Sequence, residues 1–383
     1  MNYRLLGRSG LRVSELCLGG GTFGVNWGTL GADEPESRRI FDAFAAAGGN
    51  FIDTSNRYQE GQSETFVGKF IQGRRDRFVI GTKYSLFDLT GKDNDDPNAC
   101  GNHRKNMVRS VESSLKRLGT DYIDLLWIHI YDYTTPVEEI MRALDDLVRQ
   151  GKVLYVGASN FPAWWIARAN TLADAHGWSP FIATQLEWAI TERSCEPEFL
   201  PMAAELDLGL VAWSPLGGGV VTGKYNSAPA KPDELRRLAP HVDPKIESFW
   251  HEATRRNLKI MEQVNAIARE IGRPSVQVAI RWLLQQKVVG VPVISARTLA
   301  QLQENLSALE FTLSDAVLAR LDEASLPAIA SPLPWAGPYP YPMLEFGSPA
   351  LPNFFSRALL SGGVEKKIVN HRRRYPFRFQ PGS

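Results

Sequence analysis

The chain has 383 residues, of which 44% are hydrophobic and 22% are charged, and its formal net charge at pH 7 is +1. This composition is typical of a globular protein with a large core, organised as one large α/β domain or as two smaller ones. It offers no basic surface for nucleic acid, apart from the short stretch HRRRYPFRF near the end of the chain.

The N-terminal segment, MNYRLLGRSGLRVSELCLG, intersperses charged residues among apolar ones, which is not the pattern of a signal peptide. We find no run of ~20 apolar residues that predicts a membrane span. We therefore expect a cytoplasmic protein without a membrane partner. The three cysteines, Cys17, Cys100 and Cys195, lack the CxxC or Cys/His spacing of a zinc site, so we expect reduced thiols with packing roles and no metal.

Alternating apolar residues over Tyr3–Val13 predict a small hairpin ahead of the main fold. A strand over Glu15–Leu18 then leads into GGGTFG, where Gly19, Gly21 and Gly24 match the dinucleotide-binding pattern G-x-G-x-x-G. That pattern requires a helix to begin within it, so that the helix N-terminus holds the pyrophosphate. Because VNWGTLGADEPESRR follows instead, the sequence predicts a close turn rather than a Rossmann phosphate loop.

From Pro35 to Leu309, segments of helical periodicity alternate with short apolar strands. About eight such strands follow the hairpin, which indicates parallel βαβ units rather than an antiparallel sheet. The predicted strands after Glu15–Leu18 are Phe51–Asp53, Phe78–Thr82, Ile123–Ile130, Val153–Ser159, Phe181–Glu187, Gly209–Gly219 and Val288–Ser295. The predicted helices are Glu36–Ala47, Ser63–Ile71, Arg104–Leu118, Val137–Gln150, Ala163–Ala175, Pro197–Leu206, Ala253–Ile271, Val276–Gln286 and Leu299–Leu309.

Eight βα units close a barrel, whereas a doubly wound sheet in two domains is the alternative. No linker divides the units, and polar or glycine-rich positions fall at the carboxyl ends of the strands, where a barrel builds its active site. We therefore predict an α/β fold, a (β/α)8 TIM barrel over residues 1–326 with an N-terminal hairpin. Residues 327–383 form an irregular C-terminal extension rich in proline and aromatic residues. Its composition fits either a disordered tail or a tail that packs, for example over the barrel mouth.

Polar side chains stand at or just after the ends of successive predicted strands: Asp53, Tyr58 in the following loop, Lys83 and His129. In a barrel these strand ends meet at one rim. We expect the Lys83 ammonium to lower the pKa of Tyr58 toward the working range, and Asp53 to keep Lys83 charged and in place. Tyr58 is then a usable proton donor, and His129 can orient a carbonyl oxygen by a hydrogen bond. Protonation of a developing alkoxide needs a hydride from elsewhere, hence a nicotinamide cofactor.

Each residue alone has a simpler explanation: Lys83 as a solvated strand end, His129 as a core histidine and Asp53 as a helix cap. Their occurrence together at successive strand ends favours a shared site.

The same residues stand within DTSNRYQEGQSE, FVIGTKYS, SLKRLGTDYIDLLWIH, GKVLYVGASNF, WSPLGGGVVTGKY and ARTLAQLQENL, and this ordered set resembles the aldo-keto reductase superfamily from about Tyr3 to Leu309. The tryptophan-rich segments and GNHRKNMVRS look most like the branch that contains aryl-alcohol dehydrogenases and fungal polyketide-type ketone reductases. The resemblance implies that Tyr58 is the general acid, that Lys83 and Asp53 tune its pKa, and that His129 orients the carbonyl.

The resemblance also implies a cofactor site. The nicotinamide carboxamide is expected to bond Ser159, Asn160 and Gln185, and Trp213 to stack on the nicotinamide ring, although core packing is the simpler role for Trp213. The loop Ser214–Gly219, with Lys224, is expected to wrap the pyrophosphate. The full set of expected cofactor contacts is Gly21, Thr22, Phe23, Asp53, Ser159, Asn160, Gln185, Trp213, Ser214, Pro215, Leu216, Gly218, Lys224, Ser295, Arg297, Gln301, Glu304 and Asn305.

The closing motif, Ser295–Asn305, matches the adenosine site of the family. Arg297 is free to pair with a 2′-phosphate, and Gln301 and Asn305, one helical turn apart, face the adenine, which favours NADPH over NADH. Ser295 stands where many members carry glycine or lysine, and Gln301 where some carry a second arginine. The strength of the preference for NADP is therefore left open.

Together these features predict an NADPH-dependent carbonyl reductase that acts on small-molecule aldehydes or ketones without a metal. Two alternatives stay open: a redox-sensing NADP(H)-binding subunit with little turnover, and an NAD-linked alcohol dehydrogenase. The walls of the substrate pocket are expected from the loops Asn26–Asp33 and Phe87–Asn102 and from the C-terminal region, so the sequence does not identify the substrate. It gives no oligomeric state.

Overall fold

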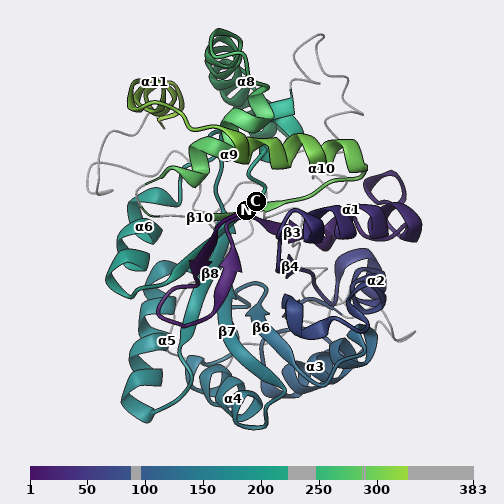
Figure 1. The fold of residues 1–383 in the computed structure, drawn as a ribbon. Coiled ribbons are helices and arrows are strands. Elements are labelled where there is room, and N and C mark those ends of the chain that lie inside the picture. Colours follow the sequence, from purple (N-terminus) through teal and green to yellow (C-terminus); the bar gives the residue numbers. More distant parts are fainter. Residues whose placement is uncertain (88–95, 223–246, 287, 289, 327–383) are drawn as a thin grey trace.

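Eight parallel strands close into a barrel with helices around it (Figure 1). The computed structural model describes residues 1–87, 96–222, 247–286, 288 and 290–326, with the backbone alone over 247–255. The strand order around the barrel is β10-β3-β4-β5-β6-β7-β8-β9, which confirms the predicted (β/α)8 TIM barrel. The strands are β3 (Cys17–Gly19), β4 (Phe51–Asp53), β5 (Val79–Tyr84), β6 (Ile123–Ile128), β7 (Val153–Ser159), β8 (Phe181–Glu187), β9 (Gly209–Trp213) and β10 (Gly290–Ile294).

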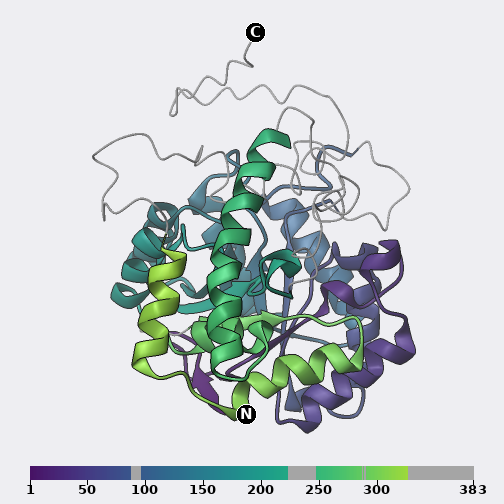
Figure 2. The same cartoon turned by 90° about the horizontal axis from the view of Figure 1, so that it is seen from above.

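Helices cover the outside of the barrel, at least one after each strand, as the two views in Figures 1 and 2 show. They are α1 (Glu34–Ala46), α2 (Gln62–Ile71), α3 (Arg104–Leu118), α4 (Val137–Arg149), α5 (Ala163–His176), α6 (Glu196–Glu205), α8 (Glu247–Glu270), α9 (Ser275–Leu284), α10 (Leu299–Leu306) and α11 (Asp315–Ser325). None of the helices in the described part of the chain is both long enough and apolar enough to span a bilayer.

Two of the differences between the predicted and the observed helices have identifiable reasons. We expected the first helix to begin after Pro35, but α1 begins at Glu34, because proline is tolerated in the first turn, where its missing N–H costs nothing. Asp33 caps this helix by accepting from the Glu36 N–H at 2.9 Å. Helix α11 was not predicted at all. Its start is marked by Ser314, whose hydroxyl accepts from the Val317 N–H at 3.3 Å.

Among the described residues, the two large parts of the core lie between the strands and the helices and inside the barrel, and Phe87, Ala99 and Cys100 form a separate small cluster. The largest side chain of the interior is Trp127, which is fully buried. Gly157 leaves room for it on the neighbouring strand, since a Cβ at that position would lie 2.5 Å from the indole ring. The interior is formed by Leu6, Val13, Cys17, Phe51, Val79, Leu125, Trp127, Ile182, Ala183, Val211, Val291 and Val293.

The predicted hairpin is present as β1 (Tyr3–Leu5) and β2 (Arg12–Ser14), paired antiparallel. It closes the amino end of the barrel, because its turn lies against the first residues of β8 and β9. A Cβ at Gly7 would lie 2.1 Å from the Ile182 carbonyl oxygen, and the Arg8 N–H donates to the Asp207 carbonyl at 2.7 Å. The opposite, carboxyl end of the barrel is therefore the end that is left for a site.

The seam between β10 and β3 joins the last strand of the barrel to the first. Its ladder has two aligned residue pairs. Contacts beyond the strands extend it: Thr22 Oγ1 donates to the Ala296 carbonyl at 2.8 Å, and the Leu299 N–H donates to Glu36 Oε1 at 2.7 Å. The loop after β10 is thus bonded to the loop and helix that follow β3.

Some predictions concern residues outside the described ranges. These are the C-terminal extension 327–383, Lys224 of the expected pyrophosphate loop, and residues 88–95 of the expected long polar loop.

Candidate active site

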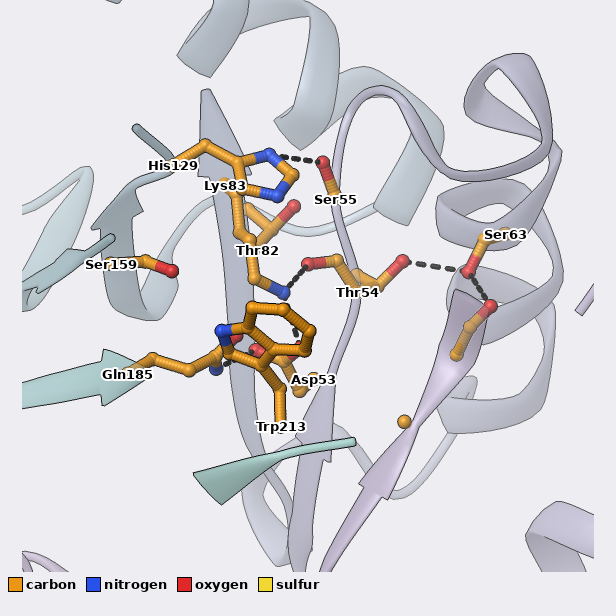
Figure 3. Close-up of polar contacts among 12 residues, drawn as sticks. Asp53, Thr54, Ser55, Ser63, Thr82, Lys83, His129, Ser159, Gln185 and Trp213 are labelled. Carbon is orange, nitrogen blue, oxygen red and sulfur yellow. Dashed lines mark hydrogen bonds and ion pairs between the residues drawn. The ribbon is translucent and has the colours of Figure 1, made fainter. Parts of the chain in front are cut away.

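The four side chains singled out in the sequence converge at the carboxyl rim. Asp53 ends β4, Lys83 lies near the end of β5, and His129 follows β6. Asp53 and Lys83 form an ion pair that is almost completely buried, and the Lys83 ammonium also donates to the Thr54 carbonyl at 2.9 Å (Figure 3). Because both partners come from the ends of adjacent strands, the barrel itself fixes this pair.

Tyr58 lies in the loop between β4 and α2, and its ring is partly buried. Lys83 Nζ lies 4.7 Å from the centre of this ring. The His129 ring packs edge-on against it, with centroids 5.9 Å apart and an interplanar angle of 81°. Tyr58 therefore stands between the ammonium of Lys83 and the imidazole of His129.

The protonation states follow from burial and from the Asp53–Lys83 pair. Burial raises the pKa of the Tyr58 phenol, and the Lys83 charge offsets only part of this rise. The expectation that the pKa of Tyr58 is lowered overall is therefore wrong here, because desolvation of the phenolate outweighs the nearby cation. Burial also opposes charge on Lys83, but Asp53 and Tyr58 outweigh it and the net pKa of Lys83 is raised.

His129 is held from several sides. Its backbone N–H donates to Ser85 Oγ at 3.1 Å, and its carbonyl accepts from Asn160 Nδ2 at 3.0 Å. Ser55 Oγ lies 3.4 Å from its Nδ1. Burial, reinforced by the charge of Lys83, lowers the pKa of His129 well below its ordinary value, so the imidazole is neutral at pH 7.

The residues expected to contact the nicotinamide form a hydrogen-bonded group next to Asp53. Gln185 Nε2 donates to Asp53 Oδ1 at 3.0 Å (Figure 3). Asn160 Nδ2 lies 2.9 Å from Ser159 Oγ, and Asn160 Oδ1 accepts from Trp213 Nε1 at 3.0 Å. Trp213 is only partly buried, so its ring is not simply a core residue. Hydroxyl, amide and indole groups of this kind fit a carboxamide and the flat ring that carries it.

The loop after β9 has the backbone shape of an anion cradle. Ser214 and three consecutive glycines, Gly217, Gly218 and Gly219, have φ values of 51°, 55°, 63° and 95°. Side chains are disfavoured at such positions, and a Cβ on Gly217 would lie 2.5 Å from Thr191 Oγ1. The Gly217 and Gly219 N–H groups donate to the Ser214 and Leu216 carbonyls at 2.8 and 3.0 Å, so this loop is closed by its own turn hydrogen bonds, and phosphate binding there stays a prediction.

The residues expected to bind the adenosine form hydrogen bonds with other residues of the protein. Arg297 donates from Nη1 to the Thr29 carbonyl at 2.8 Å, and its backbone N–H donates to Gln301 Oε1 at 2.8 Å. Asn305 is buried and donates to the Ser295 carbonyl at 3.3 Å. Gln301 and Asn305 thus bond the loop after β10, whereas Glu304 is exposed. Arg297 is exposed and has a neutral oxygen as its partner.

Three expected contacts lie in the loop after β3. Gly21 lies beside Tyr58, since a Cβ there would lie 3.9 Å from the Tyr58 ring, and Thr22 bonds the loop after β10. Phe23 is completely buried and packs edge-on against Phe70, with ring centroids 6.1 Å apart. Its side chain belongs to the core, so any contact that it makes with a ligand is limited to its backbone.

The sequence did not point to three residues of the site. Ser55 and Ser85 support His129, and the Asn56 N–H donates to the Lys83 carbonyl at 3.2 Å. Trp27, from the expected pocket loop Asn26–Asp33, packs edge-on against Tyr58 with centroids 6.2 Å apart. The partner of each serine hydroxyl depends on backbone angles. Ser85, for example, has φ of 115°, which no residue pattern reveals.

Left-handed backbone is concentrated at this rim. Among the described residues, seven non-glycine residues have positive φ, and six of them follow strands β4 to β7 and β9 at their carboxyl ends. Such conformations cost of order 1–3 kcal/mol each and occur preferentially at functional sites. The six are Gln59, Glu60, Ser85, Tyr133, Asn160 and Ser214.

The chain is similar to known reductases and dehydrogenases. The Aldo/keto reductase family profile matches residues 15–326. The chain is 37% identical over 328 residues to norsolorinic acid reductase of Aspergillus flavus, covering 84% of this chain and 80% of that protein. It is 36% identical over 350 residues to an aryl-alcohol dehydrogenase [NADP(+)] of Phanerodontia chrysosporium, covering 88% and 87%. An uncharacterised oxidoreductase of Bacillus subtilis is 37% identical over 331 residues, covering 84% and 95%.

Proposed function

The chain belongs to the Aldo/keto reductase family and is an oxidoreductase, and from this premise we propose that it is an NADPH-dependent carbonyl reductase with Tyr58 as its proton donor. The observation that carries the proposal is the position of Lys83, which is paired with the Asp53 carboxylate and lies 4.7 Å from the centre of the Tyr58 ring. A buried ammonium in this position stabilises the phenolate that Tyr58 becomes when it gives up its proton.

Bound NADPH supplies the hydride that reduces the carbonyl carbon to an alcohol carbon, leaving NADP⁺. Tyr58 donates its phenolic proton to the carbonyl oxygen. Its raised pKa keeps the phenol protonated at neutral pH, which is the form that a proton donor needs. Lys83 favours the phenolate only as the proton leaves, and Asp53 prevents the loss of the Lys83 charge.

His129 acts as a hydrogen-bond donor to the substrate oxygen. Because its pKa lies well below the ordinary value, it donates as a neutral imidazole and does not compete with Tyr58 as the acid. Gln185 bonds the second oxygen of Asp53 and so fixes the carboxylate that faces Lys83.

The substrate class that we propose is an aromatic aldehyde or ketone. The relatives include an aryl-alcohol dehydrogenase that is named for NADP⁺ and a norsolorinic acid reductase. Trp27, which is partly buried and packs edge-on against Tyr58, offers an aromatic surface beside the proton donor.

The test compares the full chain with Tyr58→Phe. Purified protein is mixed with NADPH and a panel of aromatic aldehydes, and turnover is followed by loss of the reduced-nicotinamide absorbance. We expect Tyr58→Phe to lower kcat by about 10³-fold, the range for loss of a general acid, because the phenol acts on the transition state. We expect NADPH affinity, measured by quenching of tryptophan fluorescence, to be nearly unchanged.

A buried serine that touches none of the catalytic groups provides the control. Ser110→Ala removes a hydroxyl on α3 and is expected to keep the activity of the parent chain. If the parent chain oxidises NADPH no faster than Tyr58→Phe with every carbonyl compound tested, the proposed function is wrong.

A further inference from the structure

The imidazole of His129 must carry its single proton on one of two nitrogens, and only one of these forms suits the proposed reaction. Ser55 Oγ lies 3.4 Å from Nδ1, a contact drawn in Figure 3. The nitrogen that is protonated is set by the hydrogen bond made by the other nitrogen. If Nδ1 accepts from Ser55, the proton stands on Nε2, the nitrogen that would donate to the substrate carbonyl oxygen. If Nδ1 carries the proton, Nε2 has none to give.

The Ser55 hydroxyl has one hydrogen and two candidate acceptors. Its oxygen accepts from the Arg57 backbone N–H at 3.2 Å. Besides His129 Nδ1, the side-chain oxygen of Asn56 lies 3.3 Å away, so the hydrogen can point to either group. The orientation of the Asn56 amide therefore decides which way the hydroxyl points.

Asn56 favours one orientation. It is 1% exposed, and its Nδ2 has no hydrogen-bond partner among the described residues. A buried N–H group without a partner is costly, and the oxygen and nitrogen of an amide are told apart by their hydrogen-bonding environment. Rotating this amide by 180° brings the NH₂ group to Ser55 Oγ and leaves a carbonyl oxygen in the unpartnered position, which is tolerated better.

In that arrangement every group around Ser55 has a consistent role. Its oxygen accepts from the Arg57 N–H and from the Asn56 NH₂, which uses both lone pairs. Its hydrogen then has His129 Nδ1 as its acceptor. The 3.4 Å separation is long, as catalytic hydrogen bonds often are before substrate binds.

We propose that Ser55, oriented by the Asn56 amide, is a positioning residue that holds His129 as the Nε2–H tautomer. This rests on the proposed function, because that tautomer lets neutral His129 donate to the substrate carbonyl. Ser85 and Asn160 hold the backbone of His129 by hydrogen bonds, and Ser55 determines which ring nitrogen carries the proton. Neither Ser55 nor Asn56 has to touch the substrate for this role.

The first test reads the tautomer directly, without substrate or cofactor. In ¹⁵N-labelled protein, the nitrogen shifts of His129, assigned by their loss in His129→Gln, distinguish Nδ1–H from Nε2–H. We expect Nε2–H in the parent chain and in Ser55→Thr, which keeps the hydroxyl. In Ser55→Ala we expect a mixture of tautomers. A parent chain with the proton on Nδ1 overturns the proposal.

The second test measures turnover. We expect Ser55→Ala to lower kcat for aldehyde reduction by about 10-fold to 100-fold with little change in KM, the scale found when a group that orients a metal-binding histidine is lost. Ser55→Thr is expected to restore most of it. Ser110→Ala controls for loss of a buried hydroxyl. Unchanged kcat in Ser55→Ala, with the tautomer also unchanged, overturns the proposal.

A third variant, Asn56→Asp, tests the role of the Asn56 amide. Both oxygens of a carboxylate are acceptors, so either orientation of this side chain presents an acceptor to Ser55. The Ser55 hydrogen then turns to the carboxylate, and the His129 proton is expected on Nδ1. Retention of Nε2–H in this variant contradicts the proposed role of Asn56. The tautomer is measured without turnover. If the parent chain is inactive but shows Nε2–H, the proposed reductase function is wrong, whereas the proposed position of the His129 proton is still supported.

Discussion

At the scale of single residues, burial determines the charge states of the site. Asp53 and Lys83 neutralise each other within the barrel rim, while Tyr58 and His129 are pushed toward their neutral forms by desolvation. A neutral phenol and a neutral imidazole beside one compensated cation are the states required for donation to a carbonyl oxygen. The site thus holds its working protonation states before any ligand binds.

The low pKa of His129 predicts how stability depends on pH. The unfolded chain binds a proton on this histidine below about pH 6.5, whereas the folded chain resists it, so folding loses stability as the pH falls below that value. The slope is at most about 1.4 kcal/mol per pH unit. We expect His129→Gln to remove this part of the acid sensitivity, measured by urea denaturation at a series of pH values.

The exposed histidine at position 176 is the control for this prediction, because His176→Gln changes the same residue type on the surface. Equal acid sensitivity of the parent chain and His129→Gln contradicts the assignment of a buried, neutral imidazole.

The convergence of Asp53, Tyr58, Lys83 and His129 was predictable from sequence, because their positions at or just after strand ends bring them together once the strands form one barrel. Ser55, Asn56 and Ser85 were not, since their roles depend on rotamers and on one unusual backbone angle. The direction of the Tyr58 pKa was also missed, because desolvation scales with depth, and depth is not visible in a residue pattern.

At the scale of elements, the contact between β6 and β7 is set by a large and a small residue. Trp127 fills the barrel interior, and Gly157 on β7 lies directly against its ring. Close packing of this kind leaves no space for an added methyl group. The lack of a side chain at position 157 is therefore what allows the tryptophan at position 127.

We predict that Gly157→Ala destabilises the protein by about 1–3 kcal/mol, the usual cost of overpacking a core. The added Cβ would lie 2.5 Å from the indole ring and 3.1 Å from the Ala183 carbonyl oxygen. Urea denaturation measures the change. Gly10→Ala is a matched control, because a Cβ there has no atom within 4 Å. Adding Trp127→Phe to Gly157→Ala should restore part of the loss; equal stability of Gly157→Ala and Gly10→Ala contradicts the prediction.

The order and type of most elements were predictable, because apolar periodicity changes clearly between the strands and the helices from Pro35 to Leu309. The residues at which the elements begin and end were less predictable. The first helix was expected to begin after Pro35, which stands in the first turn of α1, and α11 was not predicted although six of its eleven residues are apolar.

At the scale of the whole molecule, the adenosine end of the proposed cofactor site coincides with the seam of the barrel. Arg297, from the loop after β10, bonds the Thr29 carbonyl in the loop after β3. A phosphate group would offer this guanidinium an anionic partner in place of a neutral one. Cofactor binding at Arg297 would therefore change the contact between the loop after β10 and the loop after β3.

We predict that NADPH stabilises the chain more than NADH does, and that Arg297→Ala removes most of the difference. A ligand at 100 times its Kd stabilises the folded state by about 2.7 kcal/mol, so the effect is measurable by thermal unfolding at matched concentrations. Arg320→Ala, a surface arginine paired with Glu270, is the control. Equal shifts with the two cofactors, or an unchanged NADPH shift in Arg297→Ala, contradict the role of Arg297.

Closure of the barrel through β3 and β10 also bears on how the protein is made. The ribosome releases β10 about 270 residues after β3, which takes roughly 14–55 s at 5–20 residues per second. Throughout that interval β3 presents a strand edge that β10 covers in the closed barrel. An uncovered strand edge can pair with another chain, so the emerging polypeptide depends on protection from aggregation until β10 has been released.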